Sequence, residues 1–194
     1  MRLAIFGGTF DPIHNAHLTI ARRAAEVYRL DRILFVPAAR PPHKAGFTHA
    51  AYTDRVRMAE LACECEPRFE VSRLEEGTVR SYSIDTIEKV RSRLAPEDEL
   101  FFIIGADAFA EIRTWRRWED VARLVCFIVV SRPGHHYETP EGVQLQRLDS
   151  IDLEVSSSEI RRALAANEVP GDVPMCVLNY IAGHKLYGAG VPAE

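Results

Sequence analysis

Short runs of apolar residues alternate along this chain with stretches of helical period. Four runs end at a turn or a polar loop and predict strands: Arg2 to Phe6, Arg32 to Val36, Leu100 to Ile104 and Val125 to Val130. Continuous apolar runs are typical of strands buried on both faces of a parallel sheet. Helical spacing predicts helices over residues 14–28, 52–65, 83–94 and 106–124, the last with a break near Thr114. This alternation predicts an α/β fold, a doubly wound parallel sheet with helices on both faces.

The pattern changes after residue 134, where a polar loop is followed by shorter elements. We expect two short strands there, over residues 143–148 and 153–155. Two short helices should follow. Ser156 or Ser157 caps the first, which runs to Ala166, and Pro174 lies in the first turn of the second, which runs to about Ala182. Because no low-complexity linker or internal repeat occurs, we treat residues 1–194 as one domain with a small helical C-terminal end.

Composition and charge exclude several classes of protein. The chain is 47% hydrophobic and 27% charged, an ordinary globular composition that needs no disulfide or metal to stabilise its core. The net charge of -4 gives no field that would gather nucleic acid or an anionic membrane. No apolar run is long enough to span a membrane, and the first residues lack the features of a secretory signal. We expect a cytoplasmic protein that binds neither nucleic acid nor membrane.

The cysteines give no sign of a metal or disulfide framework, because no C-x-x-C pair occurs among them. We expect reduced, mostly buried thiols without a chemical role at four positions: Cys63, Cys65, Cys126 and Cys176.

The loop after the first strand carries candidate chemistry. It contains neither G-x-G-x-x-G nor G-x-x-x-x-G-K-[ST], which argues against dinucleotide redox binding and P-loop hydrolysis. Gly7 and Gly8 instead let backbone amides approach an anion, and a helix begins near His14 with its positive end at the same place. His14 and His17 lie on one face of that helix, their Cβ atoms roughly 5–6 Å apart. A plain turn, surface histidines or half of a metal site are the alternatives, and the combination favours phosphate binding.

A second candidate lies far downstream, in the segment VSSSEIR at residues 155–161. A serine cluster ahead of a helix is most simply an N-cap. The remaining hydroxyls and first-turn amides form another seat for an anion, and Arg161 supplies a guanidinium fork. Two phosphate-binding helix starts favour a long polyphosphate over a monophosphate.

These motifs resemble a known family. GGTFDPIHNAH at residues 7–17 and VSSSEIR are similar to the two signatures of the paired-histidine nucleotidyltransferases, and within them of the bacterial nicotinate mononucleotide adenylyltransferases. PPHK, SYSIDT, IGAD followed by Trp115, and SRPG occur in the order expected of that branch. The resemblance runs from Met1 to about Tyr187. Ala16 stands where the signature usually has Gly, and Arg116 and Arg117 stand where relatives often have an aromatic and a different basic residue.

The resemblance implies a Rossmann-like sheet and a reaction. The implied enzyme transfers AMP from ATP to nicotinate mononucleotide, forming nicotinate adenine dinucleotide and pyrophosphate in NAD biosynthesis, with Mg²⁺ bridging ATP oxygens. Such a transfer requires positioning and charge stabilisation but no protein nucleophile, which agrees with the absence of a nucleophile and base pair. Transfer to nicotinamide mononucleotide or phosphopantetheine, and a nucleotide-binding module without turnover, remain alternatives. The sequence does not indicate an oligomeric state.

The resemblance also assigns site residues. The catalytic set is His14, His17, Lys44 and Arg161. The ATP-binding set is Gly7, Gly8, Thr9, Phe10, His17, Gly105, Asp107, Ser157 and Arg161. The set for nicotinate mononucleotide is Thr9, Lys44, Tyr82, Ser83, Trp115 and Arg132, and no residue is assigned to a metal. For three of these a structural role is the alternative: Asp107 or Ser83 as a helix cap, and Trp115 as a core residue.

Overall fold

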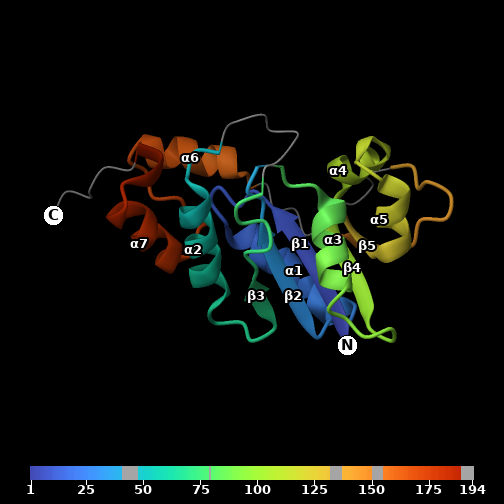
Figure 1. Ribbon diagram of the computed structural model, residues 1–194. Helices are drawn as coiled ribbons and strands as arrows, with labels where there is room; N and C mark the ends of the chain where they lie inside the picture. The colour runs from blue at the N-terminus through green and yellow to red at the C-terminus, as the bar shows by residue number, and fades with distance from the viewer. Residues whose placement is uncertain (41–47, 79, 132–136, 150–154, 189–194) are drawn as a thin grey trace.

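A parallel sheet forms the centre of the computed structural model, which describes residues 1–40, 48–78, 80–131, 137–149 and 155–188 (Figure 1). The sheet has six strands in the order β3-β2-β1-β4-β5-β6, and every neighbouring pair is parallel. The strands are β1 (Arg2–Gly8), β2 (Arg32–Pro37), β3 (Phe69–Val71), β4 (Glu99–Gly105), β5 (Cys126–Ser131) and β6 (Leu145–Asp149). The predicted α/β class is therefore confirmed.

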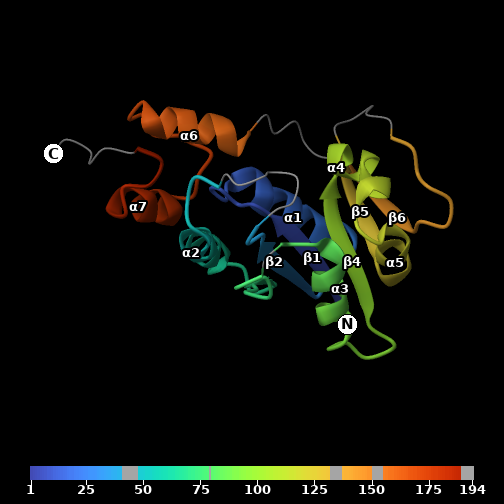
Figure 2. The same cartoon turned by 45° about the horizontal axis from the view of Figure 1, so that its top comes forward.

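Helices cover both faces of the sheet, as Figures 1 and 2 show. One face packs against α1 (Asn15–Val27), α2 (Tyr52–Cys63), α6 (Ser157–Ala165) and α7 (Met175–Gly183). The other packs against α3 (Ser83–Arg91), α4 (Ala106–Ala110) and α5 (Trp118–Leu124). Short 3-10 helices cover Ile112–Thr114 and Leu186–Gly188.

Strand β1 illustrates why the apolar runs are continuous. Its residues point alternately to opposite faces, so that Ala4 and Phe6 join the core under α1 while Leu3 and Ile5 join the core under α3. Both faces are covered by helices, and polar residues therefore have no place in the middle of the strand.

The register of β1 opens a crevice at one edge of the sheet. Strand β1 pairs with β2 as far as Gly8, opposite Pro37, but with β4 only as far as Phe6, opposite Ile103. The chain order reverses between β1 and β4, which makes their carboxyl ends the topological switch point of the sheet. In open parallel sheets this is where ligands bind.

Several element boundaries differ from the predictions. Helices α2 and α3 end at Cys63 and Arg91, before the predicted ends. The break predicted near Thr114 is confirmed, because the stretch 106–124 divides into α4, a 3-10 turn and α5. Strand β6 is displaced by one or two residues, and Pro174 precedes α7 as its N-cap instead of lying in its first turn. Strand β3 was not predicted, because three residues are too few to give a period. The predicted strand 153–155 falls largely outside the described residues.

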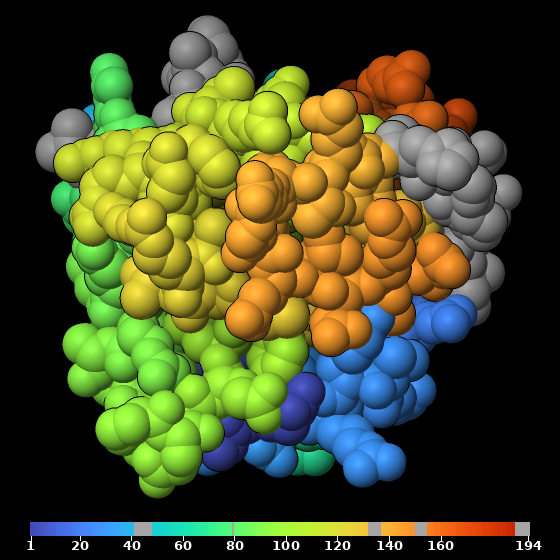
Figure 3. Space-filling model, turned by 90° about the vertical axis from the view of Figure 1, so that its right-hand side faces the viewer, coloured from blue at the N-terminus to red at the C-terminus, as the bar shows by residue number. Residues whose placement is uncertain are grey.

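Strand β6 forms one edge of the sheet, and β3 forms the other. Figure 3 looks onto this side, where the orange residues of segment 137–149 lie beside the yellow residues of α5. The Tyr28 hydroxyl, at the end of α1, donates a hydrogen bond to the carbonyl of Arg147 in β6, so helix and edge strand are joined directly. Within the described ranges, no helix is long and apolar enough to cross a membrane.

The expectation that the thiols are mostly buried was wrong. All four cysteines are free, but only Cys63 is buried, Cys126 is half-buried, and Cys65 and Cys176 are exposed. Cys65 lies beyond the end of α2, and the Cys176 thiol donates to the carbonyl of Leu61 in α2 over 3.5 Å.

Candidate functional site

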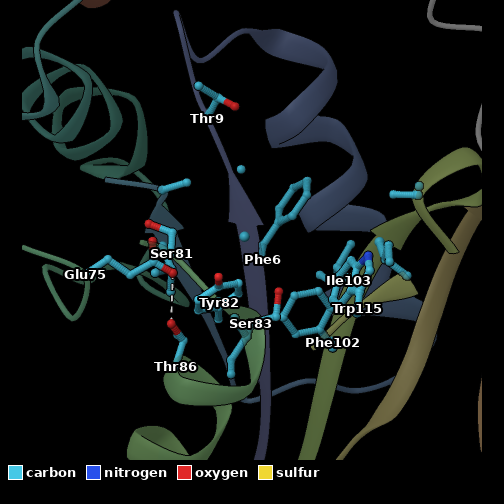
Figure 4. A pocket seen from close by; sticks show the side chains of 18 of the residues that line it. Phe6, Thr9, Glu75, Ser81, Tyr82, Ser83, Thr86, Phe102, Ile103 and Trp115 are labelled. Atoms are coloured by element: carbon cyan, nitrogen blue, oxygen red, sulfur yellow. Dashed lines mark hydrogen bonds between the residues drawn. The ribbon is translucent and has the colours of Figure 1, made fainter. Parts of the chain in front are cut away.

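A cleft of about 460 Å³ lies at the crevice between β1 and β4 (Figure 4). Its wall comes from the carboxyl ends of β1, β2 and β4, the start of α3 and the segment that follows the 3-10 turn. Figure 4 shows Glu75, Ser81 and Thr86 on one side and Phe102 and Trp115 on the other. The predicted site residues that line it are Gly7, Gly8, Thr9, Tyr82, Ser83, Gly105 and Trp115.

The other predicted residues divide into two groups. Phe10, His14, His17, Asp107, Ser157 and Arg161 are described but lie outside the lining of the cleft. Lys44 and Arg132 lie outside the described residues.

The turn after β1 is shaped by Gly8 and Phe10. The Phe10 ring is buried against Phe6, Phe35 and His17, with its centroid 5.1 Å from that of His17. A Cβ atom on Gly8 would lie 2.8 Å from this ring, closer than carbon atoms can approach. Phe10 also has φ of 49°, a left-handed conformation that is costly for a residue with a side chain. The glycine therefore gives Phe10 its space, and Phe10 in turn supports His17.

The two histidines lie together at the start of α1. His14 is the N-cap residue, and its ring centroid lies 3.8 Å from that of His17, with a 33° tilt between the planes. The backbone N–H of His14 donates to Nδ1 of His17 over 3.2 Å. An accepting Nδ1 leaves the proton of a neutral imidazole on Nε2, so His17 presents Nε2–H as a donor. Partly exposed, His17 is also more accessible than His14.

Burial makes His14 a neutral group at physiological pH. Its side chain is 5% exposed, and its Nδ1 has no hydrogen-bond partner among the described residues. Desolvation lowers the pKa of His14 from 6.5 to about 4. The ring therefore packs against that of His17 without adding a positive charge.

This pKa predicts a pH-dependent loss of stability. Unfolded His14, with a pKa near 6.5, takes up a proton below that pH, whereas the folded protein resists doing so until about pH 4. The free energy of unfolding therefore falls between pH 6.5 and pH 4, by up to about 3 kcal/mol from this residue. Urea unfolding of the protein and of His14→Asn across this range measures the difference, with His184→Asn as the control at an exposed histidine. Identical pH dependence in the protein and His14→Asn would contradict the assignment.

Asp11 connects three segments around the same turn. Its buried carboxylate accepts hydrogen bonds from the backbone N–H groups of His49 (2.7 Å) and Ala50 (3.1 Å) and from the Tyr187 hydroxyl (2.7 Å). Burial, together with this hydrogen bond, raises the pKa of Tyr187, so its hydroxyl remains a donor. The start of α2 and the end of the described chain are thereby fixed to the loop that carries the histidines.

The start of α6 packs against the same loop. Ser156 caps the helix by accepting the N–H of Glu159 (3.2 Å), which resolves the choice between Ser156 and Ser157. The Ser157 hydroxyl donates to the carbonyl of Pro12 (3.1 Å). Nη1 of Arg161 donates to the carbonyl of Asp11 (2.7 Å), and its Nη2 to the Ser158 hydroxyl (3.1 Å). The second predicted phosphate seat thus adjoins the first, although the two are about 150 residues apart in sequence.

The alternative structural roles were helix caps for Ser83 and Asp107 and a core position for Trp115. Tyr82 is the N-cap of α3 and Gly105 that of α4, so neither Ser83 nor Asp107 is a helix cap. Ser83 lines the cleft instead, while Asp107 is exposed in the first turn of α4. Trp115 is half-buried, packed edge-on against Phe102 at 5.8 Å, and also lines the cleft.

Besides Asp11, the sequence analysis missed two buried charged residues among those that the structure describes. Arg55 is fully buried in α2 and donates to the carbonyls of Thr9 (2.6 Å) and Ala50 (3.3 Å). Its position three and four residues before Met58 and Ala59 places it on the apolar face of the helix, a signal that helical spacing contains. Glu75 is buried in the cleft wall, where its carboxylate accepts the Ala39 N–H (3.2 Å) and the Thr86 hydroxyl (2.8 Å). No local pattern distinguishes Glu75 from its neighbour Glu76.

Comparison with known proteins identifies the class that this fold and site define. A family model described as cytidylyltransferase-like matches residues 5–163, and the chain belongs to this family of nucleotidyltransferases. A chain from Plasmodium falciparum, described as nicotinic acid mononucleotide adenylyltransferase complexed with NaAD, shares the fold with a TM-score of 0.78 at 20% identity, and the match covers 98% of each chain.

Sequence relatives define the branch within this class. A probable nicotinate-nucleotide adenylyltransferase of Solibacter usitatus is 68% identical over 187 residues, covering 96% of this chain and all of that protein. A protein of Thermus thermophilus with the same description is 46% identical over 189 residues, with the same coverage. The chain is a member of the nicotinate-nucleotide adenylyltransferases.

Proposed function

We infer that the protein transfers the adenylyl group of ATP to nicotinate mononucleotide, releasing pyrophosphate and forming nicotinate adenine dinucleotide. The observation that carries this inference is the joining of two features at the switch point of the sheet: the paired histidines and the cleft. Phe6 links them, because it lines the cleft and its ring contacts that of His17 at 6.0 Å. Membership of the family described above supports the same reaction.

The reaction is a direct displacement at phosphorus. A phosphate oxygen of the mononucleotide attacks the α-phosphorus of ATP, the new P–O bond forms, and the bond to the pyrophosphate oxygen breaks. The protein contributes position and charge stabilisation. We propose that Nε2–H of His17 donates to an oxygen of the α-phosphate, where negative charge gathers in the transition state. His14 supports that ring from below.

The remaining predicted residues surround the two substrates in this proposal. Ser157 and Arg161 would hold the β- and γ-phosphates, and the amides of Gly7 to Phe10 would line the phosphate path. Gly105 and Asp107 would face the adenosine, with Lys44 and Arg132 as further cations. Tyr82, Ser83 and Trp115 would enclose the pyridine ring, since they line the cleft together.

Nucleotidyltransferases generally use a divalent metal ion with ATP. We propose Mg²⁺, which would neutralise charge on the polyphosphate while bound to phosphate oxygens and water. Asp107, an acidic side chain in the first turn of α4, would order this water. In the part of the chain that the structure describes, no three His, Cys, Asp or Glu side chains are grouped as metal ligands.

A coupled assay tests the reaction. The protein, incubated with ATP, Mg²⁺ and nicotinate mononucleotide, should release one pyrophosphate for each nicotinate adenine dinucleotide formed, as measured by chromatography and pyrophosphatase-coupled phosphate release. Binding of ATP without pyrophosphate release would instead support a binding module without turnover.

A further inference from the structure

The charged side chains of the cleft are few. Of the described residues that line it, only Glu75 and Arg116 carry a formal charge. Both oxygens of Glu75 are engaged, by Ala39 and Thr86, and the residue is 7% exposed. The Arg116 side chain is 54% exposed, so among the described lining residues it is the cation that an incoming ligand meets.

Arg116 is held in place beside the pyridine end of the cleft. Its guanidinium carbon lies 4.8 Å from the centre of the Tyr82 ring. Nη1 of Arg80 donates to the Tyr82 hydroxyl over 3.1 Å, which fixes the ring on which Arg116 lies. The Asp85 carboxylate lies 3.9 Å from Nη1 of Arg116, and both side chains of this pair are about half exposed. A pair so exposed leaves much of the guanidinium's attraction available to a ligand.

A second hollow of about 420 Å³ lies behind the same residues. Tyr82, Arg116 and Glu75 line both hollows. Arg116 and Tyr82 therefore lie between the two hollows, where the guanidinium can contact a ligand in the first. Trp115, the preceding residue, lines the first hollow only.

We propose that Arg116 is a specificity-determining residue: its guanidinium, held over Tyr82, favours a carboxylate on the pyridine ring over the uncharged carboxamide. This proposal rests on the proposed function. It adds to that function the attraction between the Arg116 guanidinium and the carboxylate of the acceptor. The two acceptors have nearly the same shape and differ by one negative charge, so the charges that line the cleft add to the discrimination that hydrogen-bond donors provide. Glu75 would repel the acid, and Arg116 is the described lining residue that opposes this repulsion.

Arg117 provides a matched control. It is the adjacent arginine, but it pairs with Glu88 (2.8 Å) and Asp120 (2.7 Å) on the outside of α3 and α5 and does not line the cleft. Arg116→Gln and Arg117→Gln therefore each remove one positive charge from neighbouring positions. Only Arg116 makes the proposed contact with the ligand.

The experiment measures kcat/KM for nicotinate mononucleotide and for nicotinamide mononucleotide, with saturating ATP. Arg116→Gln should lower the ratio of acid to amide by about fivefold, mainly through a higher KM for the acid, as expected for a partly exposed charge pair. Arg116→Lys, which keeps the positive charge, should retain part of the preference for the acid. Arg117→Gln should keep it within about twofold, since only long-range charge changes.

Ionic strength gives a second readout. Raising the salt concentration from about 0.05 M to 0.5 M should narrow the acid-to-amide ratio of the unmodified protein more than that of Arg116→Gln. An unchanged ratio in Arg116→Gln, or an equal loss for both acceptors, would overturn the assignment while adenylyl transfer by the unmodified protein stands. If the unmodified protein forms no dinucleotide from either acceptor, the proposed function and this inference are both wrong.

Discussion

Replacing His17 with Ala should lower kcat by about 10²-fold or more while the KM for ATP changes only a few-fold. The reason is that a donor aimed at an oxygen of the α-phosphate strengthens its contact as charge builds in the transition state, whereas ground-state ATP is held by many other groups. The His17 ring is positioned for this role by the His14 N–H and by Phe10. Steady-state kinetics with varied ATP measure both constants.

The structure offers two variants that separate the donor from its support. Asn at position 17 can still accept the His14 N–H through Oδ1, as Nδ1 does now, but has nothing in the place of Nε2. Gln reaches further and can place its amide near the position of Nε2. We expect His17→Asn to be as impaired as His17→Ala, and His17→Gln to recover part of the rate. His184→Ala, at an exposed histidine, is the control. Near-normal turnover in folded His17→Asn would remove His17 from the chemistry.

Arg161→Lys should reduce kcat/KM for ATP by about tenfold or more, and Arg161→Ala by more still. An ammonium keeps the charge but cannot form two parallel hydrogen bonds to phosphate oxygens. Arg161 also donates to the carbonyl of Asp11 and to Ser158, so its loss loosens the contact between α6 and the histidine loop. Thermal unfolding of each variant therefore accompanies the kinetics.

The neighbouring Arg162 is the control for this series. Its side chain is 78% exposed and lies 4.0 Å from Glu159, away from the loop. Arg162→Ala should leave kcat/KM for ATP within about twofold. If Arg161→Lys were fully active and only Arg161→Ala impaired, the residue would act as a simple charge and the bidentate role would be wrong.

The elements that the sequence predicts best are those whose signal is local. Strands β1, β2, β4 and β5 each consist of a continuous apolar run, because both of their faces are buried. His14 and His17 are three residues apart, so helical geometry alone brings them together. The Ser156 cap likewise depends on a contact between residues only three apart in the sequence.

The contacts that sequence reasoning missed depend on distant partners. Strand β3 is defined by its pairing with β2, from Ile33 opposite Phe69, and has too few residues to signal itself. The Asp11 carboxylate joins Tyr187, which lies 176 residues away. Glu75 is buried because Ala39 and Thr86 supply its hydrogen bonds, and neither partner can be identified from the residues around it. Long-range pairing of this kind can be read only from the folded chain.

The most direct test of the proposed reaction is a comparison of kcat/KM for three acceptors with ATP and Mg²⁺: nicotinate mononucleotide, nicotinamide mononucleotide and phosphopantetheine. We predict that nicotinate mononucleotide is preferred over its amide by about 10²-fold or more, because donors aimed at both carboxylate oxygens leave the amide NH₂ facing another donor, at roughly 1–3 kcal/mol for each unmade hydrogen bond. Phosphopantetheine should give no measurable product. Comparable values for the two mononucleotides, or a preference for the amide or for phosphopantetheine, would contradict the nicotinate assignment.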